Sequence, residues 1–454
     1  MKKLSLLVLA CCLGFPIFGQ LKPVYSFQKD DIVARKSYGE QSIKKKQTWI
    51  AGLDKKYAGE YKKVYQTHFE QINKLWESDR VVTDPAAHGY LQSLVEKIKT
   101  ANPELQNTDA RIVFSRDWWP NAYSMGDGSI AINAGLFVYL DNEAELIFIL
   151  CHEIAHYYLD HTNSSIKKYV ETVNSDEVQK ELKRLSKTQY RVNQQLEELT
   201  KAFTFNSRRH SRERETEADR MAFQFMKNTG YDCNAIESCL RLLDKIDESS
   251  LFKPLDLPQV FNFENYPFKK SWIQQESSIF SQANKDDSPK DKRERDSLKT
   301  HPDCEKRIAM LQDSIRSKNG QGLKFMVDEN RFQKLKKDFL AEMTEQCYRD
   351  KNYGRNLYFS LLFLQSEEFR PFAIYSVGRC LKTIYEEQRD HQLGKKLDTE
   401  NSAHHEDYNL LLRLLSRVRL HEIASIGYHY CQQHEDFMKE YIGFAEIQQS
   451  LKNF

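Results

Sequence analysis

His152-Glu153-Ile154-Ala155-His156 is the stretch of this chain that decides its fold and its chemistry. Residues four apart lie on one face of a helix, so His152 and His156 can direct two imidazoles at one metal ion. This HExxH pattern is typical of a zinc site, where Glu153, one step around the helix, can act as a general base toward water. The pentapeptide therefore predicts a helix that carries a metal centre.

The residues around this box predict a buried helix over 141–159. Asn142 is a good N-cap, and Glu145 three residues later completes a capping box. Apolar residues at helical spacing predict a core-facing stripe: Leu146, Ile149, Leu150 and Ile154. His161 follows His156 by five residues, which places it off the face that the two histidines share. A third ligand must therefore come from another part of the chain.

The segment 211–219, which reads Ser-Arg-Glu-Arg-Glu-Thr-Glu-Ala-Asp, offers that ligand. One face of the predicted helix has two alanines, so it can approach another helix closely; its members are Glu215, Ala218, Asp219, Ala222 and Met226. A carboxylate ligand belongs on this buried face, so Glu215 is favoured. Glu217 lies on a fully polar face and is expected to be a solvated charge. Asp219, one turn after Glu215, can orient a ligand or assist catalysis.

Taken together, these segments resemble a known family. The HExxH box, the 211–219 segment and Thr300-His301-Pro302 with Arg307-Ile308 following are similar to the metallopeptidases of the CAAX prenyl protease and HtpX type. The soluble, BepA-like periplasmic branch fits best, because no later segment of the chain is long and apolar enough to span a bilayer. The resemblance covers roughly residues 85 to 315 in pieces.

The resemblance implies a zincin domain of the gluzincin type, with roles for five residues. His152, His156 and Glu215 are expected to hold one Zn²⁺ per chain, Glu153 to act as the base, and Asp219 to be an assisting acid.

A sixth residue, His301, follows the polar, proline-containing segment 281–300, which predicts a mobile loop. The resemblance suggests that His301 is a regulatory fourth ligand that displaces water from the metal. The alternative is a histidine at a helix start with no metal role.

The ends of the chain suggest how its 454 residues divide. Residues 1–19 read as a signal peptide, with two lysines before an apolar core and Gly19 at the cleavage site. The alternatives are a lipid anchor at Cys11 or Cys12 and an uncleaved anchor helix. We expect an exported protein, with the periplasm of a Gram-negative bacterium as its location.

Residues 20–320 are expected to form the metal-binding domain, of α+β class and mostly helical. Short strands are predicted at 111–115 and 129–133, and 121–125 is expected to belong to an edge strand that holds extended substrate. A helix within 50–80 ends before Asp84-Pro85, which is a cap and first-turn signal for the next helix. A long helical insertion, 162–205, carries an apolar seam at heptad spacing, typical of a helix packed on its own domain or of a dimeric coiled coil.

Residues 321–454 are expected to form a helical C-terminal domain. Two helix pairs are predicted, at 356–369 with 371–387 and at 408–420 with 421–433. They resemble degenerate tetratricopeptide hairpins, which offer a surface for a protein partner.

Composition limits the remaining choices. The net charge of +2 gives no general attraction to nucleic acid. Cys151 is expected to be a buried apolar residue, and Cys233 and Cys239 either form a disulfide or remain free. We interpret the chain as an exported zinc-dependent endopeptidase for protein or peptide substrates, such as misfolded envelope proteins. The alternative is a chaperone or assembly factor whose zinc site is mostly latent.

Overall fold

The computed structural model describes residues 21–53, 55–186, 212–246, 252–274, 304–318, 321–401 and 404–452. The first half contains α1 (Ile32–Ala51), α2 (Ala58–Glu77), β1 (Val81–Val82), α3 (Pro85–Ala101), β2 (Arg111–Ser115), β3 (Ala122–Ser124), β4 (Ser129–Asn133), α4 (Ala134–Phe137), α5 (Glu143–Tyr158), α6 (His161–Val173) and α7 (Asp176–Ser186). A further helix covers residues 212–227. The rest contains α9 (Ala235–Lys245), α10 (Leu257–Val260), α13 (Cys304–Arg316), α14 (Glu329–Arg349), α15 (Tyr353–Phe363), α16 (Arg370–Arg389), α17 (Glu406–Arg417), α18 (Leu420–Met438) and α19 (Phe444–Lys452).

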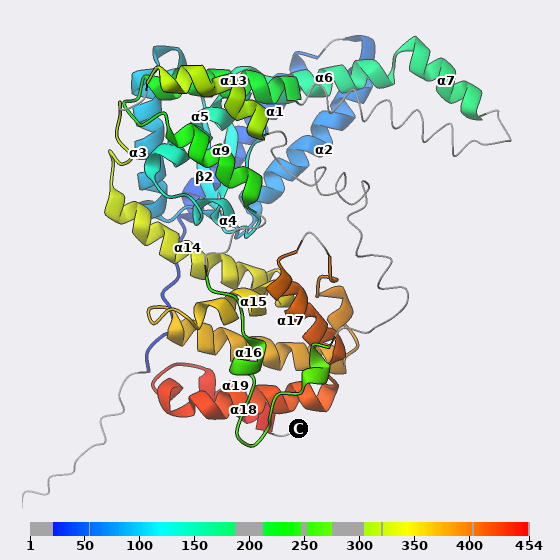
Figure 1. Ribbon diagram of the computed structural model, residues 1–454. Coiled ribbons are helices and arrows are strands. Elements are labelled where there is room, and N and C mark those ends of the chain that lie inside the picture. Colours follow the sequence, from blue (N-terminus) through cyan, green and yellow to red (C-terminus); the bar gives the residue numbers. More distant parts are fainter. Residues whose placement is uncertain are drawn as a thin grey trace, which may run out of the picture.

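The described residues are mostly helical and contain one small mixed sheet, which confirms the α+β prediction (Figure 1). The strand order is β1-β2-β4-β3, with β2 and β4 parallel and both outer pairs antiparallel. β2 and β4 are the two predicted strands. β3 lies inside the predicted segment 121–125 and forms the sheet edge next to α5.

Two large apolar clusters divide the described residues. The first surrounds α5 and takes side chains from α3, α4, the sheet, the helix of residues 212–227, α9, α13 and the first part of α14. The second lies among α15 to α19 and also contains the segment 255–273. Figure 1 shows α14 passing between these two parts of the molecule. The helical C-terminal part is thus present as expected, while the domain boundaries stay a prediction.

Polar contacts join the two parts at the loop between β2 and β3. Arg116 is buried; its Nε atom donates to Glu342 of α14 at 2.6 Å and its Nη1 atom to Asp30 at 2.9 Å. The guanidinium of Arg355, from α15, lies between the rings of Trp118 and Tyr408, at 4.2 and 3.8 Å from their centres. The loop before β3 is therefore held by residues of the helical part.

The C-terminal helices pair as the sequence predicts for its first hairpin but not for its second. α15 packs against α16. α17 packs against α15, whereas α18 packs mainly against α16 and α19. The prediction of α17 with α18 as a hairpin was therefore wrong, because the apolar face of α18 is shared with helices on either side of it. The likeness to tetratricopeptide repeats stays a prediction.

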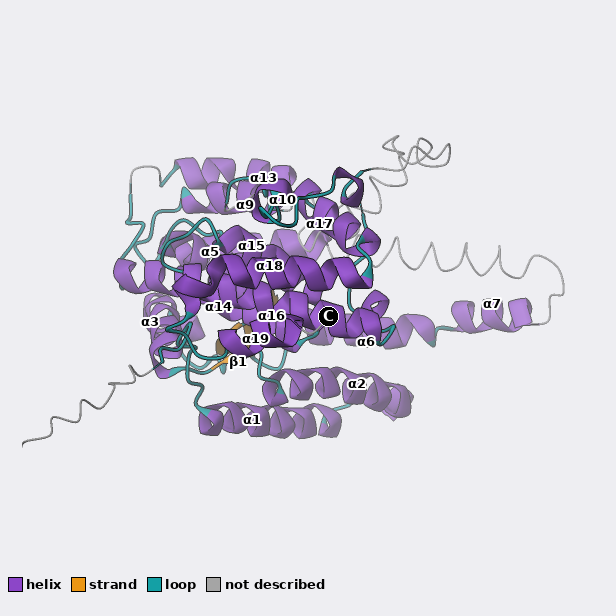
Figure 2. Cartoon of the chain, turned by 90° about the horizontal axis from the view of Figure 1, so that it is seen from below, coloured by secondary structure: helices purple, strands orange, loops and turns teal. Residues whose placement is uncertain are grey.

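The predicted insertion begins as two helices, α6 and α7, with a break at residues 174–175. Figures 1 and 2 show α6 leading away from the body to α7, while α1 and α2 lie side by side along one edge. The remainder of the seam, with residues 187–205, lies outside the described residues, as do the signal segment 1–19 and the loop 281–300.

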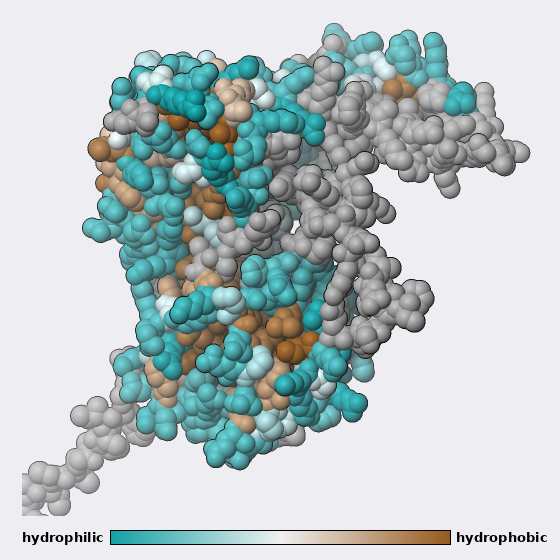
Figure 3. Space-filling view, in the orientation of Figure 1, coloured by the Kyte–Doolittle hydropathy of each residue, from teal (hydrophilic) through white to brown (hydrophobic). Residues whose placement is uncertain are grey.

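On the face drawn in Figure 3 the surface of the molecule is mostly hydrophilic, with apolar residues gathered in patches. Within the residues that the structure describes, no helix combines the length and apolar character that crossing a bilayer requires.

Cys233 and Cys239 are both buried free thiols, so they do not form a disulfide with each other, and Cys151 is buried as expected.

One buried carboxylate fixes the start of α5. Glu143 accepts hydrogen bonds from the phenol groups of Tyr90 and Tyr231, at 3.0 and 2.9 Å. It also accepts from three successive backbone N–H groups, those of residues 326–328, at 2.8 to 2.9 Å. Burial alone raises the pKa of Glu143, but these donors outweigh burial and lower the pKa overall. Its contribution to stability is therefore present at neutral pH and is lost as the pH falls through this lowered pKa.

We expect Glu143→Ala to lower the free energy of unfolding by about 3 kcal/mol or more, because it leaves several buried donors without an acceptor. Urea unfolding monitored by circular dichroism measures this loss. Glu329→Gln is the matched control: Glu329 is an exposed first-turn residue of α14, and its replacement should change the free energy by less than about 0.5 kcal/mol. Equal stability of Glu143→Ala and wild type would contradict the anchoring role.

Candidate metal centre

α5 carries both histidines of the HExxH box inside the first apolar cluster. Asn142 caps the helix by accepting from the N–H of Glu145 at 3.1 Å. The predicted capping box is only half formed, because the Glu145 carboxylate accepts instead from the N–H of Asp141. His152 is buried and His156 is 16% exposed, so the second histidine marks the side on which the site is open to solvent.

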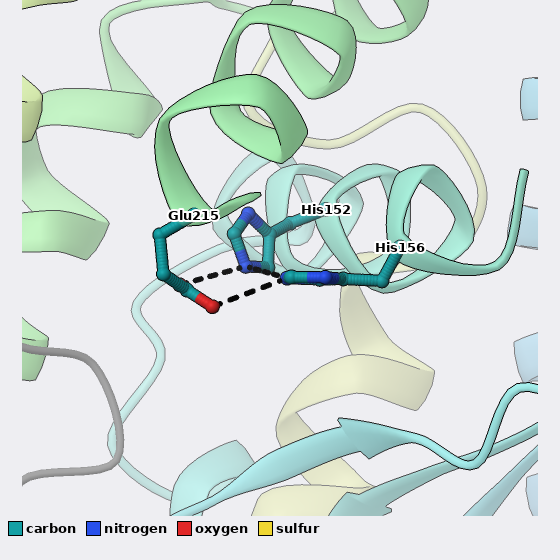
Figure 4. Close-up of side chains that lie close together, drawn as sticks. All are labelled: His152, His156 and Glu215. Atoms are coloured by element: carbon teal, nitrogen blue, oxygen red, sulfur yellow. Dashed lines mark hydrogen bonds and ion pairs between the residues drawn. The ribbon is translucent and has the colours of Figure 1, made fainter. Parts of the chain in front are cut away.

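Glu215 completes a cluster with the two histidines. Its carboxylate oxygens lie 3.4 Å from Nε2 of His152 and 3.4 Å from Nε2 of His156, and the two Nε2 atoms are 3.0 Å apart. Figure 4 shows the three side chains pointing toward one another, the histidines from α5 and Glu215 from the helix of residues 212–227. These atoms all lie within 4.8 Å of one another. Glu215, on the helix face predicted to be buried, is therefore the glutamate of this segment that lies beside both histidines.

This cluster fits a zinc ion in both chemistry and size. Two imidazole nitrogens and one carboxylate oxygen are a ligand set that catalytic zinc sites use. Tetrahedral ligands about 2.0 Å from zinc are separated from one another by about 3.3 Å, and the separations here are 3.0 to 3.4 Å. Three ligands leave one coordination position for water or substrate.

Asp219 lies behind His152, on the side away from the cluster. One of its oxygens is 3.0 Å from Nδ1 of His152, and Arg307 donates to both oxygens at 2.6 Å. Burial raises the pKa of Asp219, but Arg307 and His152 outweigh burial and lower it. Of the two roles that the sequence allows Asp219, this position favours the orientation of a ligand.

The same carboxylates make this site attractive to a cation. Burial alone lowers the pKa of His152, but the hydrogen bonds to Asp219 and Glu215 outweigh it and raise the pKa to about 10. Arg307, buried on α13, balances part of the negative charge; one of its Nη atoms is 3.7 Å from Glu215. In the sequence, Arg307 stands out only as part of the motif that carries the resemblance. Its contact with Asp219 joins residues 88 positions apart, so local spacing does not predict it.

The structure corrects the interpretation of His161. Its Nδ1 atom lies 2.9 Å from Nδ1 of His156, and its Nε2 atom lies 3.2 Å from the Glu217 carboxylate. Helical spacing would direct His161 away from the other two histidines only in one continuous helix. The chain instead turns at Asp160, which has a φ of 54°, and starts α6 at His161. Glu217 has a side chain that is 61% exposed but bonded to His161, so it is not merely a solvated charge.

Glu153 is buried beside the sheet edge. A small pocket, with room for about one water molecule, adjoins it and His152, and apolar side chains supply most of the remaining lining: Ala122, Leu136, Phe148, Ile149 and Leu243. Ala122 belongs to β3 and Leu243 to α9, so the cavity reaches from the edge strand to the helix behind the metal centre. His301 lies outside the described residues, and its role as a fourth ligand stays a prediction.

Residues 85–315, about half of the chain, match the profile of Peptidase family M48. This chain belongs to peptidase family M48. It is therefore a metallopeptidase by family, and all the residues of the centre described above fall within the matched range.

A curated relative agrees with this assignment. A protein of Vibrio cholerae serotype O1, which has the provisional name of beta-barrel assembly-enhancing protease, is 27% identical over 97 residues. The matched stretch covers 21% of this chain and 20% of the relative. The match therefore concerns one fifth of that protein's length and supports the peptidase assignment alone.

We expect Glu215→Gln to abolish stoichiometric zinc binding, because an amide is a poor replacement for a carboxylate ligand. Zinc per chain, measured by mass spectrometry of the metal after gel filtration, should fall from about one to near zero. Glu213→Gln removes the same charge from an exposed position on the same helix and should keep full zinc content. Full zinc content in Glu215→Gln would refute the ligand assignment.

Proposed function

We propose that this chain is an exported, zinc-dependent endopeptidase of the gluzincin type. The convergence of His152, His156 and Glu215 at one point, with Glu153 beside it, is the observation that carries the proposal. The family assignment supports peptide-bond hydrolysis. Ligands from two helices and a buried carboxylate on the same turn are the parts that such a hydrolase requires.

In the proposed reaction, bound zinc supplies a Lewis acid for the scissile carbonyl and for the attacking water. Glu153 accepts a proton from that water at its carboxylate and later gives it to the leaving amine, so that the base is regenerated. Asp219 keeps His152 in the tautomer that has its proton on Nδ1, which leaves Nε2 free to act as a ligand. Arg307 holds Asp219 in place through two hydrogen bonds.

The edge strand β3 is the proposed binding site for an extended substrate. It is an outer strand of the sheet and lies beside α5, so backbone groups on its outer side can pair with a substrate strand. The apolar cavity next to Glu153 starts at Ala122 of this strand. A substrate held along β3 would therefore run past apolar side chains close to the reacting bond.

We further propose quality control of envelope proteins as the biological role, with the periplasm as the location. The name of the Vibrio cholerae relative refers to β-barrel assembly, and the C-terminal helical part of this chain offers a separate surface for protein partners. The second candidate is an assembly factor or chaperone whose metal centre is mostly latent. That relative's name refers to assembly as well as to proteolysis, so one experiment should measure both.

We expect Glu153→Gln to abolish cleavage of an unfolded test protein such as casein, with a loss of at least about 100-fold, because only the proton acceptor is removed. Zinc content and folding should match the wild type. The time course of cleavage and the suppression of aggregation are both measured on the same preparations of wild type and Glu153→Gln.

Cleavage at the wild-type rate by Glu153→Gln would reject the mechanism. The assembly-factor candidate replaces the peptidase under a different result. In that result, wild type with full zinc content shows no cleavage, yet it suppresses aggregation to the same extent as Glu153→Gln.

A further inference from the structure

The two histidines of the metal centre have different partners at Nδ1. His152 contacts a carboxylate directly, since Asp219 lies 3.0 Å from its Nδ1 atom. His156 contacts another imidazole, that of His161, at 2.9 Å, and His161 contacts Glu217 at 3.2 Å. We propose that Glu217 and His161 form a relay that orients His156 for metal binding, in parallel with the direct contact of Asp219 to His152. The inference rests on the proposed function of the cluster as a zinc site.

One arrangement of protons satisfies the whole relay. With Nε2 of His156 directed at the cluster, its proton is on Nδ1, so His156 donates to His161. His161 must then accept at Nδ1 and keep its proton on Nε2, where the Glu217 carboxylate accepts it. A carboxylate at the end of such a chain makes a ligating imidazole more basic and fixes its ring plane.

The position of His161 is fixed by its neighbours. The turn between β3 and β4 packs against the next residue: a Cβ atom at Gly126, which has a φ of 82°, would lie 2.4 Å from Cβ of Thr162. Asn163 accepts a hydrogen bond from Tyr65 and donates to Asp160. The start of α6 therefore has little freedom to move away from α5, and His161 stays beside His156.

The helix of residues 212–227 is held against α6 through the same face. Arg214 and Glu217 are three residues apart and so lie on one side of this helix. Arg214 donates to Ser165, one turn along α6 from His161, to which Glu217 bonds. Two side chains of this helix therefore bond to α6, and one short segment supplies three carboxylates to the centre: Glu215 at the cluster, Asp219 behind His152, and Glu217 behind His161.

The experiment measures zinc affinity of the full-length protein by competition with a chromophoric chelator. Removal of outer-sphere partners weakens metal binding by about 10- to 100-fold, so we expect Glu217→Gln and His161→Ala each to weaken zinc binding about tenfold or more. The double variant should bind no more weakly than the weaker single variant, because the two residues act in one relay. The visible absorption of the Co²⁺ form should change in both single variants, since the ring of His156 is released.

Two controls separate the relay from structural damage. Glu213→Gln removes an equal charge from the same helix and should leave zinc affinity unchanged. The melting temperature of the zinc-free protein should change little in Glu217→Gln, because this side chain is mostly exposed. If His161→Ala does not fold, Glu217→Gln decides the question alone.

Wild-type zinc affinity in Glu217→Gln, or weakening that adds fully in the double variant, would overturn the relay. Neither result touches the proposed peptidase function, which depends on cleavage by wild type and its loss in Glu153→Gln. Conversely, a wild type that binds zinc but cleaves nothing would end the peptidase proposal and leave the relay to be judged on affinity alone.

Discussion

The hydrogen bonds accepted by Glu143 are the constraint on which the metal centre depends. This carboxylate, on the first residue of α5, accepts hydrogen bonds from two tyrosines and from the backbone before α14. These bonds hold the N-terminus of the helix in place inside the core. At its other end, the left-handed residue Asp160 stops the helix and returns the chain as α6. A helix fixed at both ends holds His152 and His156 at a constant separation, which is the pre-organisation that a metal site needs.

The charges of the side chains around His152 and His156 determine what kind of ligand this site can bind. The helix of residues 212–227 brings Glu215 and Asp219 close to the imidazoles of His152 and His156. It also brings Glu217 to the imidazole of His161, and Glu153 adds another carboxylate. Arg307 balances the charge of Asp219 through two short hydrogen bonds. Among the described residues, it is the one buried arginine in contact with these carboxylates. Closely spaced carboxylates repel one another unless protons or a cation lie between them. The arrangement is therefore better suited to hold a divalent ion than to act as an internal ion-pair network.

Helical periodicity is enough to predict those residues of the centre that lie on one helix face. Prediction from the sequence fails where the chain bends or where a side chain contacts a distant segment. His152, His156 and Glu215 could be chosen because spacing and face determine which side chains converge. The contact of His161 could not, because periodicity assumes an unbroken helix and the turn at Asp160 breaks it. The docking of residues 255–273 among the C-terminal helices was also missed, since contacts such as that between Trp272 and Glu422 join residues 150 positions apart.

The loop between β2 and β3 connects the two parts of the molecule at the point where substrate is proposed to bind. Arg116 anchors the start of this loop to Glu342 of α14, and Arg355 of α15 stacks on Trp118 within it. The loop is followed directly by β3, the edge strand beside the metal centre. Buried charge pairs and cation–π contacts of this kind break only at a substantial cost in free energy. A displacement of α14 or α15 relative to the sheet must therefore move the start of the edge strand, break these contacts, or both. The helical part thus helps to set the geometry of the edge strand at which substrate is proposed to bind.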